Sequence, residues 1–138
     1  MNKFYKTLVA LLTIGVVAAG CSSPKPGLGE SFTLKVGQSA TIASEDLKLQ
    51  FDTVVSDSRC PSDLVCIQAG EAKIRLIATQ NGAHTTLNLI EQGLTSGLNV
   101  VNYKTYTIEF KLSPYPVSTR MLGASDYRLE LTVTKDLR

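Results

Sequence analysis

The sequence predicts an all-β domain, an antiparallel two-sheet sandwich of immunoglobulin-like type with about seven to nine strands. Segments 46–52, 106–112 and 127–133 alternate strictly between apolar and polar residues, which is the period of a half-buried strand. Asn81-Gly82 is a strong signal for a two-residue hairpin turn. No stretch beyond the N-terminal apolar run shows the stripe of an amphipathic helix. A small closed barrel of the same strands is the alternative.

The hairpin turn also predicts the register of the two strands beside it, near 72–80 and 83–90. Pairing outward from the turn sets the following residues opposite each other: Gln80 and Ala83, Ile77 and Thr86, Leu76 and Leu87, Arg75 and Asn88, and Ile74 and Leu89. The Leu–Leu and Ile–Leu pairs then share one face, and the Arg–Asn pair lies on the other. A slip of one residue would destroy this match. Shorter strands are expected at 32–36, 40–43 and 98–103.

Residues 1–20 have the features of a bacterial lipoprotein signal peptide. Lys3 and Lys6 form a short basic region, and the apolar run that follows is too short to cross a bilayer as a helix. The run ends in Ala-Ala-Gly-Cys, which resembles a lipobox, whose cysteine becomes the acylated first residue of the exported protein. An ordinary secretory signal cut after Ala19 and a retained helix are the alternatives.

Lipidation at Cys21 predicts the membrane as a partner and the cell envelope as the location. Acyl chains on this residue would make the anchoring effectively permanent. Because Ser22 rather than an aspartate follows, we expect the outer membrane in a Gram-negative cell. Residues 21–31 then form a lipidated N-terminus and a flexible tether rich in proline and glycine, and residues 32–138 form one β-sandwich domain.

The charge balance argues against a nucleic-acid partner. The full chain carries 14 Lys and Arg residues against 12 Asp and Glu residues, and two of the lysines lie in the signal peptide. The exported chain therefore has a net charge near zero and no clustered basic stripe. Nothing in the sequence predicts an oligomer, so we expect a monomer.

Cys60 and Cys66 are the only cysteines that remain once Cys21 is acylated. An isolated pair in an exported protein is most simply a disulfide, here closing a crossover loop between two strands. The alternatives are a redox-active pair, for which the spacing is too wide, and a metal site, for which a distant His84 adds too few ligands. We expect a structural disulfide and neither a metal nor another cofactor.

Four residues at or near this loop are candidates for contact with a partner: Asp57, Arg59, Leu64 and Tyr115. Asp57 and Arg59 could present charge to a partner. We favour the alternative, in which Arg59 pairs with Asp57 or binds strand carbonyls, because an irregular crossover has backbone groups that need partners. The apolar tip Leu64-Val65 could anchor in a partner's pocket, but we favour a role as a lid on the sandwich end. Tyr115, held between two prolines, is either displayed or folded back over the core edge.

This segment also resembles a known family. Asp-Ser-Arg-Cys-Pro at 57–61, then Cys66 and Ala-Gly at 69–70, is similar to a pattern in small uncharacterised bacterial exported proteins and lipoproteins. Members often carry a Leu-Ser-Pro-Tyr-Pro-like segment, as at 112–116, and a final strand similar to 127–133. The resemblance implies a β-sandwich with a disulfide-pinned crossover, and it implies no activity.

The sequence argues against an enzyme. Its single histidine, His84, falls beside the hairpin turn opposite Thr79, where we expect a solvated side chain, and no common catalytic motif occurs. A carboxylate pair for glycoside chemistry is the enzymatic alternative left open. We expect a membrane-anchored, non-enzymatic binding module that contacts another envelope protein or a small ligand. The alternatives are a structural envelope lipoprotein without a discrete site and an inhibitor of a secreted hydrolase with Arg59 as its bait.

Overall fold

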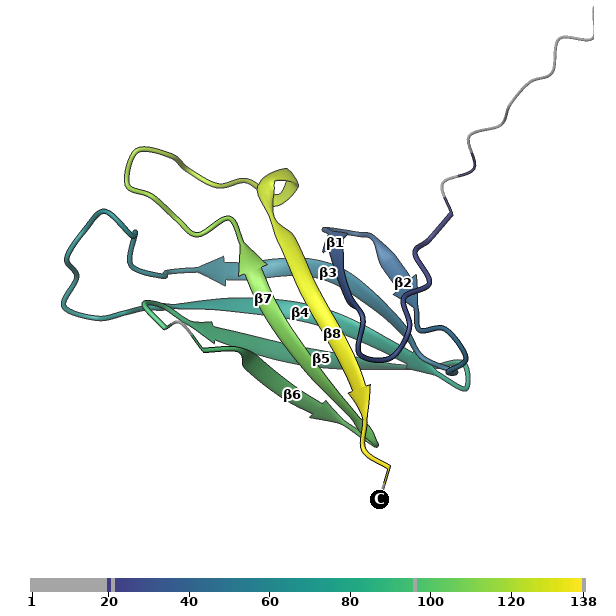
Figure 1. Cartoon of the computed structure of the whole chain (residues 1–138). Coiled ribbons are helices and arrows are strands. Elements are labelled where there is room, and N and C mark those ends of the chain that lie inside the picture. The colour runs from purple at the N-terminus through teal and green to yellow at the C-terminus, as the bar shows by residue number, and fades with distance from the viewer. Residues whose placement is uncertain (1–19, 21, 96, 138) are drawn as a thin grey trace, which may run out of the picture.

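Two stacked antiparallel sheets of four strands each make up the computed structural model, which describes residues 20, 22–95 and 97–137 (Figure 1). The strands are β1 (Ser31–Lys35), β2 (Ser39–Thr41), β3 (Lys48–Asp57), β4 (Glu71–Gln80), β5 (Ala83–Gln92), β6 (Asn99–Tyr103), β7 (Tyr106–Ser113) and β8 (Arg128–Lys135). The predicted all-β sandwich is confirmed. The predicted lipidation site, Cys21, lies outside the described residues. Within the described residues, no helix has the length and apolarity needed to span a membrane.

The strand orders of the two sheets are β1-β8-β7-β6 and β2-β3-β4-β5. Neighbours within a sheet are consecutive in the sequence, except that β1 pairs with β8. The sheets remain separate, so the closed-barrel alternative is wrong. The likeness to an immunoglobulin domain lies in the layered architecture, because immunoglobulin domains join their strands as Greek keys whereas consecutive strands here form meanders.

The β4–β5 hairpin has the register that the sequence predicts. Leu76 lies opposite Leu87, and every other predicted pair is present as well. Asn81 and Gly82 have φ angles of 51° and 73°, the left-handed conformation that a type I′ turn needs at both central positions. The turn therefore directs the apolar residues of both strands toward the core.

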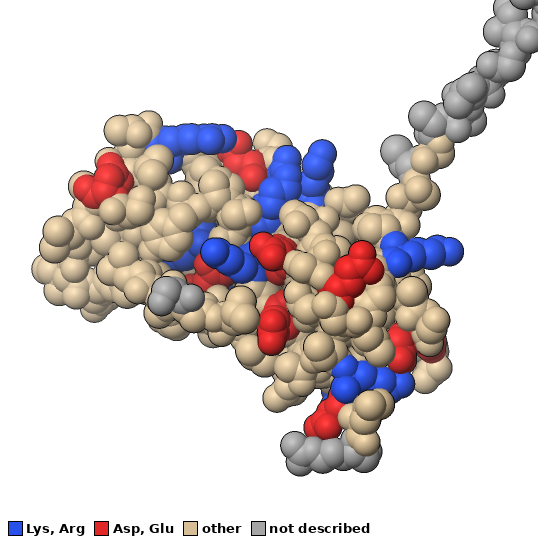
Figure 2. Space-filling view, viewed as in Figure 1, with Lys and Arg blue, Asp and Glu red and all other residues tan. Residues whose placement is uncertain are grey.

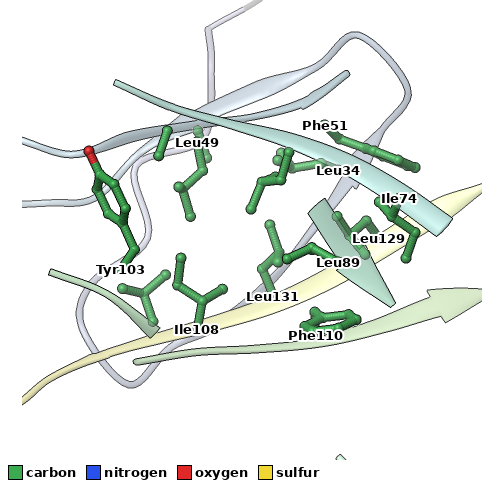
Figure 3. Close-up of a cluster of buried hydrophobic side chains, with 14 of the residues drawn as sticks. Leu34, Leu49, Phe51, Ile74, Leu89, Tyr103, Ile108, Phe110, Leu129 and Leu131 are labelled. Atoms are coloured by element: carbon green, nitrogen blue, oxygen red, sulfur yellow. The ribbon is translucent and has the colours of Figure 1, made fainter. Parts of the chain in front are cut away.

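The core lies between the two sheets and consists mainly of every second residue along the strands of both sheets, on the face directed inward. Figure 3 shows Leu49, Phe51 and Leu89 of one sheet directed toward Ile108 and Leu131 of the other. All five side chains are buried. Burial of such a side chain contributes about 1.5–3 kcal/mol, so these contacts hold the layers together.

β3 continues further along the chain than its alternating pattern predicts. Its register with β4 shifts between Phe51 and Thr53 and again between Val54 and Ser56. At each shift two residues lie opposite one, so the two-residue period is interrupted. The strand nevertheless continues to Asp57, which it delivers to one end of the sandwich.

Part of the predicted tether, around Pro24 and Pro26, lies against the sandwich. The backbone N–H of Thr41 donates to the carbonyl of Pro24 at 3.1 Å, and that of Ala43 donates to the carbonyl of Pro26 at 2.8 Å. Pro26 is buried. The two prolines therefore cover the free edge of β2, which is only three residues long.

Candidate interaction site at the loop end

Three connections meet at one end of the sandwich: those between β3 and β4, β5 and β6, and β7 and β8 (Figure 1). We call them together the loop end. The backbone N–H of Ser62 donates to the carbonyl of Pro116 at 3.0 Å, and that of Gly93 donates to the carbonyl of Gly70 at 2.8 Å. These bonds join all three connections. The tether meets the sandwich at Thr41, beside the start of β3, so the loop end lies at the far end of that strand.

The disulfide between Cys60 and Cys66 closes the β3–β4 connection, as the sequence predicts, with the two Cα atoms 6.0 Å apart. Cys60 is buried and Cys66 is exposed. The backbone N–H of Cys60 donates to the carbonyl of Ala69 at 2.8 Å, so the base of the connection is closed a second time. A loop closed in this way loses little further conformational freedom when it binds.

Arg59 lies at the centre of the loop end, with a side chain that is 0% exposed. Its Nε and Nη2 donate to the two carboxylate oxygens of Asp57 at 2.9 and 2.7 Å. Nη1 donates to Glu91 at 3.0 Å and to the carbonyl of Leu112 at 3.2 Å, and Nη2 also donates to the carbonyl of Pro114 at 3.2 Å. Since a guanidinium has five N–H groups, all are used. This geometry agrees with the favoured hypothesis, in which Arg59 pairs with Asp57 and binds strand carbonyls.

The burial of Arg59 removes it from the surface that a partner could touch. A trypsin-like hydrolase binds the arginine of its bait in a deep pocket, which needs an extended, accessible side chain. Arg59 could enter such a pocket only by breaking its bonds to Asp57, Glu91 and two carbonyls. The expectation that Arg59 serves as bait is therefore contradicted by its position.

The Arg59 network also sets the ionisation of its neighbours. Burial alone would raise the pKa of Asp57, but the hydrogen bonds and charge of Arg59 outweigh it and hold that pKa below its usual value. Burial would lower the pKa of Arg59, but its bonds to Asp57 and the charge of Glu91 raise it. Burial and the Asp57 charge raise the pKa of Tyr127, whose hydroxyl donates to Asp57 at 3.1 Å, to about 12. At neutral pH Asp57 is therefore a carboxylate and Arg59 a cation, while the Tyr127 hydroxyl keeps its proton.

Tyr115 is folded back over this network rather than displayed. Its ring centroid lies 4.9 Å from Cζ of Arg59, a cation–π geometry, and the residue is half-buried. Its hydroxyl accepts a hydrogen bond from the backbone N–H of Leu94 at 3.0 Å. Tyr115 therefore ties the β7–β8 connection to the β5–β6 connection and shields the guanidinium.

The apolar tip of the β3–β4 connection is exposed. Val65 and Ile67 have relative exposures of 103% and 105%, and Leu64 is 50% exposed. The expectation that Leu64-Val65 covers the end of the sandwich is therefore wrong. Arg59 and Tyr115 lie at that end instead, bound to the strand ends and to each other. In Figure 2 the left end of the molecule, where the β3–β4 connection lies, is mostly tan, with one acidic group above it.

A shallow cleft of about 320 Å³ lies beside the tip, between the β3–β4 and β7–β8 connections. Asp57 and Tyr127 line it together with the exposed Met121. Across its rim the backbone N–H of Ser118 donates to Asp63 at 2.8 Å, and the Ser118 hydroxyl donates to the same carboxylate. The cleft has the volume to accept one side chain of a partner next to the apolar tip.

Two glycines let the connections approach closely. A Cβ atom on Gly70 would lie 1.8 Å from the carbonyl oxygen of Ser58, and Gly70 also has a φ of 67°. A Cβ atom on Gly93 would lie 2.0 Å from the carbonyl oxygen of Ala69. Any larger residue at either position must push backbone atoms apart.

Glu91 is the site residue that sequence reasoning missed. It is buried, and its Oε2 accepts a hydrogen bond from the backbone N–H of Leu112 at 2.6 Å. A signal was present, because Glu91 continues the inward-facing series of Leu87 and Leu89 along β5. A carboxylate in a core-facing position needs a buried cation, and Arg59 supplies it.

His84 has the place that the sequence predicts. It is exposed beside the hairpin turn, and its Nδ1 lies 2.8 Å from the Thr79 hydroxyl. Among the described residues, no group of three or more His, Cys, Asp or Glu side chains is placed to hold a metal ion. The arrangement of the loop end suits contact with a partner, because its ionised groups are paired with one another and its outermost groups are apolar.

No protein-family model matches the chain, and neither the curated proteins nor the solved structures contain a significant match to it.

Proposed function

We propose that this protein is a lipid-anchored lipoprotein of the cell envelope whose sandwich serves as a non-enzymatic binding module. One observation carries the proposal: a buried, fully hydrogen-bonded support, centred on Arg59, holds up an exposed apolar tip of Leu64, Val65 and Ile67. Three large apolar side chains exposed within four residues are unfavourable in water unless a partner covers them. The tip is therefore the proposed contact surface.

The chemistry of the tip defines the kind of partner. Residues 64–70 carry no charged side chain, so the partner must offer an uncharged, apolar pocket. The disulfide and the Arg59 network hold the tip in one conformation before binding, which lowers the ordering cost. The proposed partner is another protein of the envelope, and Asp57, Arg59 and Tyr115 act as positioning residues beneath the contact.

The proposed anchor and the proposed contact lie at opposite ends of the domain. The tether meets the sandwich beside the start of β3, and the tip follows the end of that ten-residue strand, about 33 Å away at about 3.3 Å per residue. A lipid on Cys21 would therefore hold the protein at the membrane and leave the tip free to face away from it. In a Gram-negative cell the proposed location is the outer membrane.

The anchor is tested by metabolic labelling with a palmitate analogue. The wild-type chain is expected to incorporate the label and to fractionate with membranes. The Cys21→Ser variant should lose both, while Cys66→Ser should keep the label. Labelling that persists in Cys21→Ser would contradict the anchor.

The contact is tested by cross-linking in intact cells, followed by recovery of the full chain and mass spectrometry. The Val65→Ser/Ile67→Ser variant should lose the partner that the wild type recovers. Leu137→Ser is the matched control, because Leu137 is 92% exposed at the C-terminal end and lies outside the loop end. Equal recovery by all three proteins, or no partner with any of them, would overturn the binding role in favour of a structural one.

A further inference from the structure

One edge of the sandwich differs from the other three. The edge strands of the described sheets are β1, β6, β2 and β5. β1 and β6 have only five residues each, and β2 has three and is covered by the carbonyls of Pro24 and Pro26. β5 has ten residues. Long open edges are the ones that recruit another strand.

β5 also lacks the features that normally protect an edge strand. Its residues 83–90 contain no Lys, Arg, Asp, Glu or Pro. Its pairing with β4 runs without a bulge from Glu71 opposite Gln92 to Gln80 opposite Ala83, whereas β3 is interrupted twice. Charge, proline and bulges are the usual means of preventing edge-to-edge pairing. Residues 83–90 of the β5 edge are therefore uncharged, and their pairing has no bulge.

The register identifies which backbone groups of β5 face outward. In a two-residue hairpin the residues that flank the turn, here Gln80 and Ala83, form a hydrogen-bonded pair, and such pairs then alternate. The odd-numbered residues of β5 thus bond to β4, and the even-numbered ones point their N–H and C=O groups away from it. Within the described residues, no backbone hydrogen bond joins His84, Thr86 or Asn88 to any segment beyond that edge.

In place of the monomer expected from the sequence, we infer that this edge pairs with β5 of a second copy of the chain, antiparallel about a twofold axis, so that two sheets join into one. Because residues 83–90 carry no Lys, Arg, Asp or Glu, two copies of this segment meet without like-charge repulsion, and the exported chain has a net charge near zero. An antiparallel strand is its own partner under twofold symmetry, and β5 matches itself in length. His84, Thr86 and Asn88 are exposed along this edge and would line the join. This surface is separate from the loop end.

The inference is tested with a photo-activated cross-linking residue placed at Thr86 in the full-length chain in intact cells. The same residue at Thr33, an exposed threonine of the short edge strand β1, is the matched control. We expect an adduct of twice the chain mass from position 86 and none from position 33, with cross-linked peptides that belong to this chain alone.

Two variants then separate edge pairing from misfolding. Asn88→Pro removes an outward N–H group, and Asn88→Lys adds a charge while it keeps the whole backbone. Each should abolish the adduct, whereas Asn88→Ala should retain it, with circular dichroism unchanged in the lysine and alanine variants. An adduct that survives Asn88→Lys, one formed equally from position 33, one with a different protein, or no adduct at all would overturn the inference.

Discussion

Two clusters at opposite ends of the sandwich combine the same kinds of group with different surroundings. At the loop end, Arg59 pairs with Asp57 and stacks on a tyrosine ring. At the other end, Lys135 pairs with Glu45 at 2.9 Å and lies 5.6 Å from the ring centroid of Tyr106. The side chain of Arg59 is 0% exposed, whereas that of Lys135 is 35% exposed. From this comparison we expect burial, more than the presence of an ion pair, to decide how strongly each cluster stabilises its surroundings.

The two clusters differ in what their cations hold. Arg59 binds groups from β3, β5 and β7 and from the chain after β7, so its loss would release several segments at once. Among the described residues, the Lys135 ammonium group donates hydrogen bonds to Glu45 only and lies over the Tyr106 ring. A buried charge left without its partners costs far more than an exposed one, because water cannot replace the lost bonds.

Replacement of the buried cation should have the largest effect. Arg59→Met leaves the carboxylates of Asp57 and Glu91 without a counter-charge and should lower the free energy of unfolding by about 3–5 kcal/mol. Lys135→Met, the matched change at the exposed cluster, should alter it within experimental error. Urea unfolding of both variants measures the difference. Equal losses would contradict the comparison.

Removal of the disulfide should come next. Cys60→Ser/Cys66→Ser opens a seven-residue loop, for which the chain-entropy relation gives about 2.4 kcal/mol. The loss should show in the same unfolding assay. Because Arg59 still holds the base of the loop, protease cleavage of the folded variant should be confined to the β3–β4 connection. An unchanged midpoint would show that the disulfide has no part in holding the loop end.

A methyl group at Gly93 tests the close contact of the connections. Gly93→Ala places a Cβ atom 2.0 Å from the carbonyl oxygen of Ala69, so the backbone must move, with a cost of about 1–3 kcal/mol. Gly97→Ala is the control, because a Cβ atom there has nothing within 4 Å. If thermal denaturation gives both variants the same midpoint, the two connections are not packed as described.

Lowering the pH should produce the smallest of the expected changes in the free energy of unfolding. Because the folded-state pKa of Asp57 lies below its unfolded value of about 3.9, the stability it contributes is present above about pH 4 and is lost as pH falls through the folded pKa. The gap in unfolding free energy between wild type and Asp57→Asn should therefore narrow below pH 4. Glu45, whose pKa is lowered by Tyr106 and Lys135, should produce a weaker effect in Glu45→Gln. A gap that stays constant with pH would contradict the role given to Asp57.

Prediction from the sequence succeeded where the pattern is local. The Asn81-Gly82 turn and the alternating residues beside it determine the β4–β5 register, because turn geometry and side-chain period act over neighbouring residues. The pairing of Arg59 with Asp57 is also local, since the two are separated by one residue. The cysteine pair was recognisable because no other cysteine lies in the domain.

Prediction failed where the outcome depends on segments far apart in the chain. Glu91 meets Arg59 across 32 residues, and nothing beside Glu91 indicates that partner. Leu64 and Val65 were expected to cover the sandwich end, but Arg59 and Tyr115 occupy it. Whether an apolar loop residue is buried depends on which side chains from distant segments occupy the end of the sandwich. The sequence of the loop alone does not reveal this.

The most direct test of the central claim, that a buried network presents an apolar tip to a partner, is quantitative cross-linking in intact cells with the full chain. Val65→Ser/Ile67→Ser should lose a partner that both the wild type and Leu137→Ser retain, at equal membrane levels and equal folded stability. If the partner is recovered equally by all three proteins, or if none of them recovers one, the tip is not the contact and the account of the loop end as a binding site is contradicted.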